Sequence, residues 1–108
     1  MDISIVIPAY DESKKIARDI EAATAFLENQ HFTGQVIVVD DGSRDNTAEV
    51  AKNAVTNPPT GVEIKVERYD HHRGKGYAVR KGIEQTSGKY VMFSDSGLCV
   101  PYADTLRG

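Results

Sequence analysis

The chain alternates short apolar runs with amphipathic stretches. β-Branched residues dominate the runs at 3–7 and 36–39, and another apolar run covers 90–93. Runs of this length, closed by Pro or by polar turn residues, predict strands. Between the runs, apolar residues recur every three or four positions, which predicts helices with one buried face. The first such series is Ile16, Ile20, Ala23 and Leu27.

Residues 62–66 follow a different pattern, in which Val62, Ile64 and Val66 alternate with charged residues. This alternation predicts a half-exposed strand near the edge of a sheet. The complete order is βαβαβαβ, and alternation at this spacing implies parallel strands joined by right-handed crossovers. We therefore predict an α/β domain with a Rossmann-like, three-layer parallel sheet.

Composition narrows the class of protein. The chain has 108 residues, of which 40% are hydrophobic and 27% charged, as in one globular domain or part of one. The net charge of -3 argues against a nucleic-acid binder that relies on bulk electrostatics. No apolar run approaches the length of a membrane span. The single cysteine, Cys99, suits a reducing compartment, so we expect a cytoplasmic location.

Polar residues concentrate where the predicted strands end. The four segments concerned are 8–12, 40–43, 69–76 and 94–97, and each follows an apolar or alternating strand. In an open parallel sheet, ligands bind outside the carboxyl ends of the strands. The sequence therefore predicts one ligand site built from these four loops.

Acidic residues stand at the ends of two strands. Asp40 or Asp41 could accept hydrogen bonds from a nucleobase N–H or a ribose hydroxyl, or could instead satisfy loop amides and cap the next helix. Spacing alone favours neither interpretation. Asp95 could bind a hard divalent cation that bridges phosphates, or could cap the turn that follows it.

A glycine-bearing basic segment covers residues 72–80. Its glycines would let backbone amides approach an anion, and Arg73, Lys75 and Arg80 supply positive charge. The spacing is not that of a P-loop. A glycine-rich turn with a solvated basic helix start is the plainer interpretation of this segment taken alone. We interpret the adjacent His71 and His72 as loop residues near phosphate rather than as metal ligands.

Three segments taken together carry a family resemblance. Residues 7–12 (IPAYDE), 38–47 (VVDDGSRDNT) and 74–80 (GKGYAVR) follow one another at the expected spacings. This combination resembles the family 2 glycosyltransferases of the GT-A fold, above all the dolichyl-phosphate mannose or glucose synthase branch. The resemblance covers nearly the whole chain, and implies that the chain is the N-terminal, nucleotide-binding portion of such a domain.

The resemblance implies a site for a UDP- or GDP-sugar. Tyr10 would lie against the base or ribose, and the tandem acids after the second strand would contact both. Asp95 matches the first carboxylate of the family's Asp-x-Asp metal motif. The donor-binding residues implied are Pro8, Ala9, Tyr10, Glu12, Asp40, Asp41, Lys75, Arg80 and Ser96.

The sequence departs from the family pattern at the metal motif. Gly97 stands where the second carboxylate is expected, so Mg²⁺ or Mn²⁺ would rest on Asp95, diphosphate oxygens and water. Family members also continue beyond this motif into a part that carries the catalytic base and the acceptor site. We therefore assign residues 1–108 to the donor portion, with the acceptor half absent, and assign no catalytic residue.

These observations predict transfer of a sugar from a nucleotide-sugar to an acceptor such as a polyprenyl phosphate. The alternatives are a non-catalytic nucleotide-binding or assembly module and a nucleotidyltransferase-like domain.

The strand order implied by the resemblance is 3-2-1-4, which would leave residues 90–93 as an open apolar edge. Because such an edge offers unpaired backbone groups, we predict a homo-oligomer formed through this strand. The alternative is that the tail after it folds back over the edge and leaves a monomer.

Overall fold

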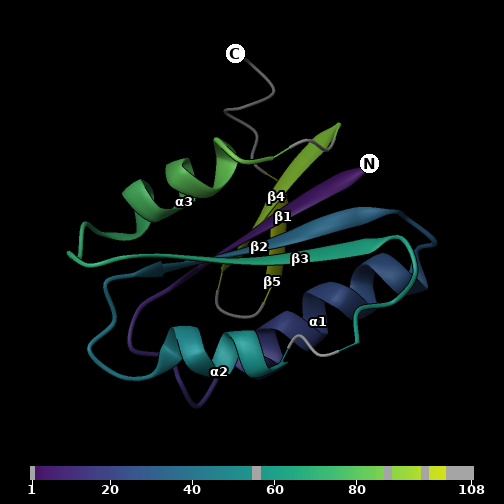
Figure 1. The fold of residues 1–108 in the computed structure, drawn as a ribbon. Helices are drawn as coiled ribbons and strands as arrows, with labels where there is room; N and C mark the ends of the chain where they lie inside the picture. Colours follow the sequence, from purple (N-terminus) through teal and green to yellow (C-terminus); the bar gives the residue numbers. More distant parts are fainter. Residues whose placement is uncertain (1, 55–56, 87–88, 96–97, 102–108) are drawn as a thin grey trace.

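The computed structural model describes residues 2–54, 57–86, 89–95 and 98–101. The order of elements confirms the predicted alternation of strands and helices and adds a fifth strand (Figure 1). The elements are β1 (Ile3–Ala9), α1 (Ile16–Asn29), β2 (Gly34–Asp41), α2 (Thr47–Ala54), β3 (Val62–Tyr69), α3 (Lys75–Ile83), β4 (Tyr90–Asp95) and β5 (Leu98–Pro101). In the described part of the chain, no helix is long and apolar enough to cross a membrane.

One sheet organises the domain, in the order β3-β2-β1-β4-β5. Strands β1 to β4 are parallel, which confirms both the parallel sheet and the implied order 3-2-1-4. β3 lies at one edge, as its alternation predicts, with Val62 buried and Glu63, Lys65 and Glu67 exposed. Charged side chains of this kind discourage pairing with another chain.

The prediction of an open edge at residues 90–93 is wrong. β5 runs antiparallel to β4, and residues from Met92 to Asp95 pair with residues from Pro101 back to Leu98. The pairing gives strand partners to the part of β4 from Met92 to Asp95, which would otherwise be open to another molecule. A homo-oligomer formed through β4 stays a prediction, and Met92 and Phe93 already have a strand partner within the chain.

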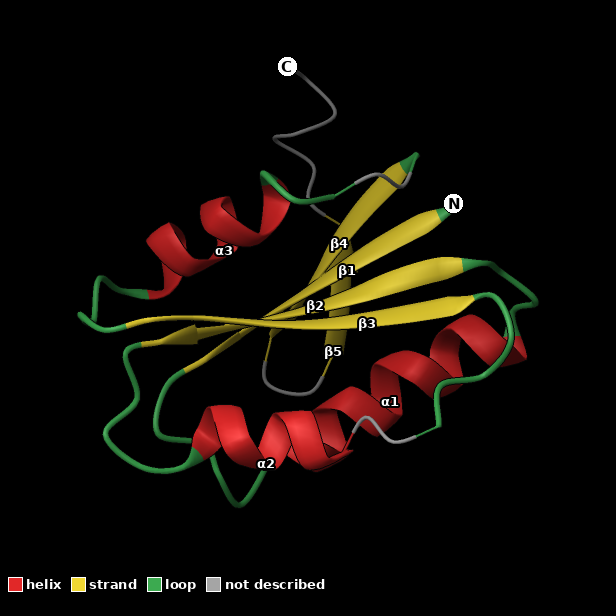
Figure 2. Ribbon diagram, in the orientation of Figure 1, coloured by secondary structure: helices red, strands yellow, loops and turns green. Residues whose placement is uncertain are grey.

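The sheet buries both faces, as the nearly continuous apolar strands predict. Helices α1 and α2 cover one face and α3 covers the other (Figure 2). Because side chains alternate along a strand, Ile5 and Ile7 pack toward α1 while Val6 packs toward α3. Successive residues of the same strand thus pack against helices on opposite faces of the sheet.

Gly82 lets α3 lie directly on the sheet. A Cβ at this position would fall well inside contact distance of Val6 Cγ1 and 3.1 Å from Val39 Cγ2. The missing side chain therefore sets the separation of helix and sheet, and with it the position of the first turn of α3 beside the strand ends.

Candidate functional site

A polar cavity of about 270 Å³ opens at the carboxyl ends of the parallel strands. It is formed by the loop after β1, the first turns of α1 and α3, and the ends of β2 and β4. This is the position at which open parallel sheets bind ligands. The residues that line it are Pro8, Ala9, Tyr10, Glu12, Lys15, Asp19, Asp41, His72, Lys75, Ala78 and Ser94.

The structure brings most of the predicted site residues to this cavity. Six of the nine predicted donor-binding residues line it, while the fully buried Asp40 and the exposed Arg80 do not. Ser96, like Gly97, lies outside the described residues, and Asp95 is placed by its backbone as the last residue of β4. The six are Pro8, Ala9, Tyr10, Glu12, Asp41 and Lys75.

Lys15 and Asp19 were not predicted as parts of the cavity, whereas Ser94 belongs to one of the four predicted loops. Lys15 Nζ lies 3.3 Å from the buried Asp19 carboxylate and 3.9 Å from that of Glu12. One feature of the sequence could have indicated this pair: Asp19 lies on the apolar face of α1, four residues after Lys15. An acid on a buried face is normally paired with a cation. Burial raises the pKa of Glu12, and nearby Asp19 adds to the increase while Lys15 opposes it.

The aromatic wall of the cavity is a pair of rings. The Tyr10 and His72 centroids are 3.9 Å apart, with the planes inclined at 34°. Tyr10 follows β1 and His72 precedes α3, so the pair joins two loops that are far apart in the sequence. The Arg44 guanidinium carbon also lies 6.0 Å from the Tyr10 ring centroid. A flat aromatic surface of this kind suits a nucleobase.

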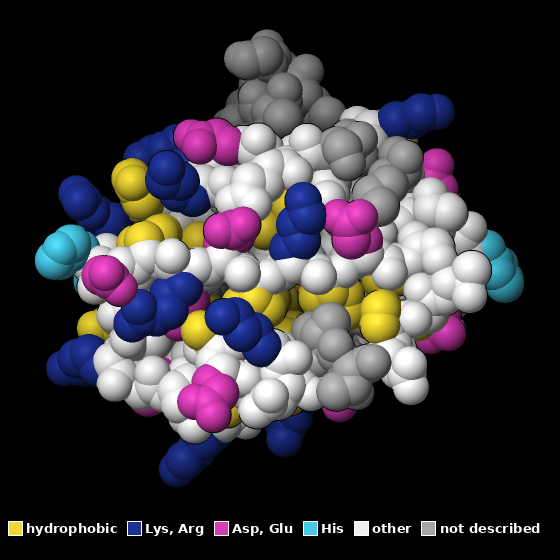
Figure 3. All heavy atoms as spheres, viewed as in Figure 1, with side chains coloured by type: hydrophobic (Ala, Val, Ile, Leu, Met, Phe, Trp, Pro, Cys, Tyr) yellow, Lys and Arg dark blue, Asp and Glu magenta, His cyan; other side chains and the backbone are white. Residues whose placement is uncertain are grey.

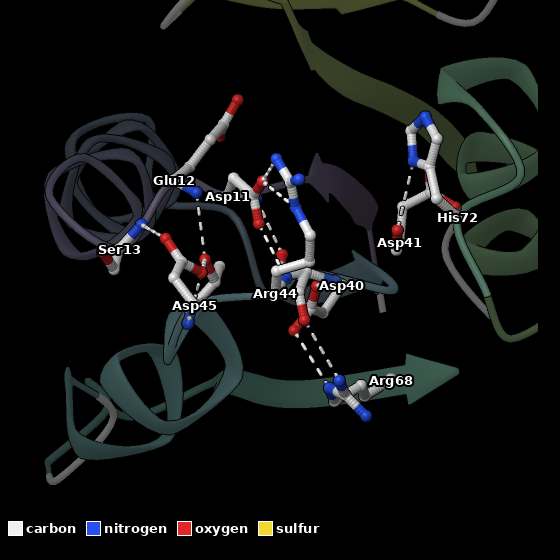
Figure 4. A network of polar contacts seen from close by, with 11 residues as sticks. Asp11, Glu12, Ser13, Asp40, Asp41, Arg44, Asp45, Arg68 and His72 are labelled. Atoms are coloured by element: carbon white, nitrogen blue, oxygen red, sulfur yellow. Dashed lines mark hydrogen bonds and ion pairs between the residues drawn. The ribbon is translucent and has the colours of Figure 1, made fainter. Parts of the chain in front are cut away.

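The carboxylate of Asp40 contacts other residues of the protein rather than the cavity. Its Oδ1 accepts a hydrogen bond of 2.9 Å from the Ser43 amide, and its Oδ2 lies 3.5 Å from Arg68 Nε (Figure 4). Arg68 also donates to the Ser43 carbonyl at 3.1 Å and pairs with Asp70 at 2.7 Å. The guanidinium thereby compensates a buried charge and ties β3 to the turn that follows β2.

Asp41 is buried beside the cavity and directs its carboxylate at the segment 72–74, as Figure 4 shows for His72. His72 Nδ1 lies 2.7 Å from Oδ2, and the amides of Arg73 and Gly74 donate at 2.8 and 2.9 Å. The Tyr69 hydroxyl makes a short hydrogen bond to the same carboxylate. Burial and this hydrogen bond raise the pKa of Tyr69.

A second network joins the loop after β1 to the loop after β2. The Asp11 amide donates to Ser43 Oγ at 2.8 Å, and the Asp11 carboxylate accepts from the Arg44 amide at 2.7 Å and from its guanidinium at 2.9 Å. The Glu12 amide donates to Thr47 Oγ1 at 2.9 Å (Figure 4). Asp11 adopts a positive φ of 50°. These bonds hold the backbone of two cavity loops in a defined shape.

Positive charge gathers near the start of α3. The segment from Arg68 to Lys81 has five basic residues and a single acid, Asp70. In Figure 3, Lys and Arg side chains crowd the left side of the view, where the loop between β3 and α3 lies. Lys75 lines the cavity, and its Nζ lies 5.7 Å from the Phe93 ring centroid. This part of the site favours an anion despite the negative net charge.

The acids whose side chains the structure describes do not form a metal centre by themselves. Among the described residues, no three His, Cys, Asp or Glu side chains come together as a metal site. Glu12 and Asp19 pair with Lys15, and Asp41 is engaged by loop donors.

Together, the parallel sheet and the polar cavity at its strand ends define an open-sheet α/β domain of the Rossmann-like class. The chain belongs to glycosyl transferase family 2, whose family model matches residues 4–105. The resemblance found in the three sequence segments is confirmed.

Similar proteins agree with this assignment. The chain is 37% identical over 98 residues to the dolichyl-phosphate beta-glucosyltransferase ALG5C of Trichomonas vaginalis. The match covers 86% of this chain and 28% of that protein. The S. aureus TarS 1-349 structure in complex with UDP-GlcNAc aligns with a TM-score of 0.72 and 26% identity over 90% of this chain and 27% of its own.

Glucosyl-3-phosphoglycerate synthase from Mycobacterium tuberculosis is a further neighbour. Its complex with Mn²⁺, UDP-glucose and phosphoglyceric acid aligns with a TM-score of 0.65 and 27% identity. The match covers 88% of this chain and 33% of that chain. The GT-A fold is confirmed for the described residues, and the chain spans between about a quarter and a third of the length of these three proteins.

Proposed function

We propose that this chain binds the nucleotide-sugar donor, UDP- or GDP-linked, of a glycosyltransferase that transfers the sugar to an acceptor such as a polyprenyl phosphate. The observation that carries the proposal is the cavity at the strand ends. All three family segments contribute residues to its lining, which also includes Lys15, Asp19, His72 and Ser94. Residues 1–108 would form the donor portion of the enzyme. The single cysteine supports a cytoplasmic location.

Each wall of the cavity suits one part of the donor. The Tyr10 ring offers a stacking surface for the base, next to the peptide of Pro8 and Ala9 and the Glu12 carboxylate. Lys75, at the first turn of α3, offers positive charge for the diphosphate. The further donor contacts that we propose from the resemblance are Asp40, Asp41, Arg80 and Ser96.

A divalent cation, Mg²⁺ or Mn²⁺, would complete the site. We propose that Asp95 and the diphosphate oxygens bind it together, because the described acids of the cavity already have partners. The Mn²⁺ and UDP-glucose in the neighbouring synthase structure support this proposal. When bound, the cation would neutralise charge on the leaving nucleoside diphosphate.

The names of the similar proteins support the reaction class. The T. vaginalis relative is a dolichyl-phosphate beta-glucosyltransferase, and the TarS structure contains UDP-GlcNAc. We infer that the present chain handles a donor of the same chemical kind. The polyprenyl phosphate acceptor is inferred from the first of these names.

Calorimetric titration with UDP, GDP and their sugar conjugates, with and without Mn²⁺, tests the proposal. We expect saturable binding of at least one donor, weakened about tenfold in Lys75→Met, which removes the cationic partner of a phosphate. Lys81→Met is the matched control on the same helix, since Lys81 lies outside the cavity lining, and should bind as the wild type does. Absence of binding for every nucleotide, or equal losses in both variants, would contradict the proposal.

A further inference from the structure

We propose that Lys15 is a positioning residue, which is held by the buried Asp19 carboxylate and in turn holds the Glu12 carboxylate at the cavity. The consequence for donor binding rests on the proposed function, in which Glu12 contacts the donor. The electrostatic link between Lys15 and Glu12 does not rest on it.

The three side chains meet at the start of α1. Lys15 Nζ lies 3.3 Å from Asp19 Oδ2 and 3.9 Å from Glu12 Oε2, and all three residues line the cavity. Residues three and four positions apart are neighbours on a helix surface, so the ammonium can contact both acids at once. The lysine therefore links a buried acid to an acid of the cavity wall.

The two acids differ in burial. The Asp19 side chain is 6% exposed and lies on the apolar face of α1 beside Ile16 and Ile20, whereas the Glu12 side chain is 32% exposed. A buried carboxylate requires a compensating cation, because water does not reach it. Asp19 thus determines where the ammonium lies, and the more exposed Glu12 carboxylate is drawn toward that position.

The energetics of the helix do not account for a lysine here. Lys15 is the N-cap residue of α1 and makes no side-chain cap hydrogen bond. The helix macrodipole disfavours a cation near the N-terminus, and a lysine four residues before an acid is the less favourable order for a helical ion pair. We therefore assign the role of Lys15 to its contacts with the two acids.

The backbone of Glu12 is held without the lysine side chain. Its amide donates to Thr47 Oγ1 at 2.9 Å, and its carbonyl accepts from the amides of Lys15 and Ile16 at 2.9 and 2.8 Å. The Glu12 side chain points away from Asp45 and the network around it (Figure 4). Replacing the Lys15 side chain should therefore affect the Glu12 carboxylate and leave its backbone in place.

Charged groups from α1, from the loop before α2 and from α3 act on the Glu12 carboxyl. Burial raises its pKa, and Lys15 is the charge that opposes this increase most strongly. Asp19 and Asp45 add to the increase, and Lys75 opposes it to a smaller extent. Lys15 thus favours the ionised carboxylate, which accepts hydrogen bonds from ligand hydroxyl or N–H groups.

An NMR titration of the Glu12 carboxyl in the nucleotide-free protein tests the electrostatic link. We expect Lys15→Met to raise the pKa of Glu12, and Lys15→Arg, which keeps the charge, to leave it close to the wild-type value. Lys14→Met is the matched control, because Lys14 is exposed and lies outside the cavity lining. An unchanged pKa of Glu12 in Lys15→Met would overturn the proposal.

A second variant covers the case in which Lys15→Met does not fold, as judged by circular dichroism. Lys15→Met/Asp19→Asn removes both members of the buried pair and leaves no uncompensated charge. The pKa of Glu12 should still rise in this variant, because Lys15 affects it more strongly than Asp19 does. A lowered or unchanged pKa would count against the role of the lysine.

Uridine binding at two pH values tests the consequence for the site. At pH 8, well above the ordinary carboxyl range, Lys15→Met should bind uridine nearly as the wild type does. At pH 5 more of its Glu12 is protonated, so its affinity should be about two- to fivefold below that of the wild type at the same pH, the range of a partly exposed ion pair. Lys15→Arg should restore the wild-type affinity.

A double-mutant cycle assigns this loss to Glu12. In the Glu12→Gln background, which has no carboxyl to titrate, adding Lys15→Met should cause no further loss at either pH. A further loss there would show that Lys15 acts on the ligand directly, contrary to the proposal.

UDP separates positioning from a phosphate contact. A positioning role should weaken UDP and uridine by the same factor at pH 5, whereas a contact with the diphosphate would weaken UDP alone at both pH values and refute the assignment. If no nucleotide binds the wild type, the proposed function fails, while the titration of Glu12 still decides whether Lys15 controls this carboxylate.

Discussion

The rings of Tyr10 and His72 lie against each other, with centroids 3.9 Å apart. Because Tyr10 stands at the cavity between two loops, its ring is the surface on which we expect the base to stack. Tyr10→Ala should weaken uridine binding about tenfold or more, since stacking on an aromatic side chain contributes ~1–3 kcal/mol per base. Tyr10→Phe, which keeps the ring, should bind nearly as the wild type does. Equal losses in the two variants, measured by calorimetry, would assign the effect to the hydroxyl instead.

Gly82 should tolerate a methyl group much less well than Gly76, although both lie in α3. A Cβ at Gly82 overlaps Val6, so Gly82→Ala should destabilise the protein by about 1–3 kcal/mol through overpacking. A Cβ at Gly76 meets only Arg80 Nη1, at 3.9 Å, so Gly76→Ala should stabilise the helix by roughly 0.5–1 kcal/mol. Urea unfolding measures both, and a stabilised Gly82→Ala would contradict the close packing of α3 on the sheet.

The contact between Asp11 and Arg44 should make stability depend on pH in the acid range. Hydrogen bonds from the Arg44 amide and guanidinium lower the pKa of Asp11 below its ordinary 3.8. A lowered carboxyl pKa stabilises the fold above the unfolded value, and this contribution is lost as pH falls through the folded value. The wild type should therefore have a higher urea midpoint than Asp11→Asn at pH 6. The difference should shrink as the pH is lowered below about 3.8, the ordinary value. A difference that grows in acid would show the opposite sign.

Mn²⁺ should bind weakly to the free chain and more tightly in the presence of UDP. The reason is that Asp95 alone offers too few ligands for a hard cation, which takes the remainder from the diphosphate and water. Asp95→Asn should remove the gain in UDP affinity that Mn²⁺ provides and leave the affinity without metal unchanged. Asp70→Asn serves as the control at an exposed acid. Tight Mn²⁺ binding to the nucleotide-free chain would reveal protein ligands other than Asp95.

Strand and helix positions were predictable because they depend on local patterns. The continuous apolar runs of β1 and β2 indicated strands covered on both faces, and the alternation of Val62 with charged neighbours indicated the edge position of β3. Parallel strands carry their carboxyl ends to one edge of the sheet, so the loop motifs alone also located the cavity. Six predicted donor residues meet there for this reason.

The short strand β5 was not predictable from its own residues. Leu98–Pro101 has four residues and ends in Pro, and an apolar run of that length does not distinguish a strand from other structure. In the structure this segment pairs with β4, a contact that its own residues do not indicate. The open edge was wrongly predicted at Met92 and Phe93 because the partner of these residues is specified by tertiary contact.

The sequence by itself determined the order of elements, the parallel sheet and the edge at which polar loops collect, since periodicity and turn residues act over a few positions. Only the tertiary structure decided how the tandem acids are used. Asp40 faces the Ser43 turn and Arg68, whereas Asp41 faces the loop before α3, more than 30 positions along the chain. Successive residues of a strand point to opposite sides. Which partner each carboxylate meets is therefore set by the elements that pack on each side, and adjacent identical residues carry no local signal of that difference.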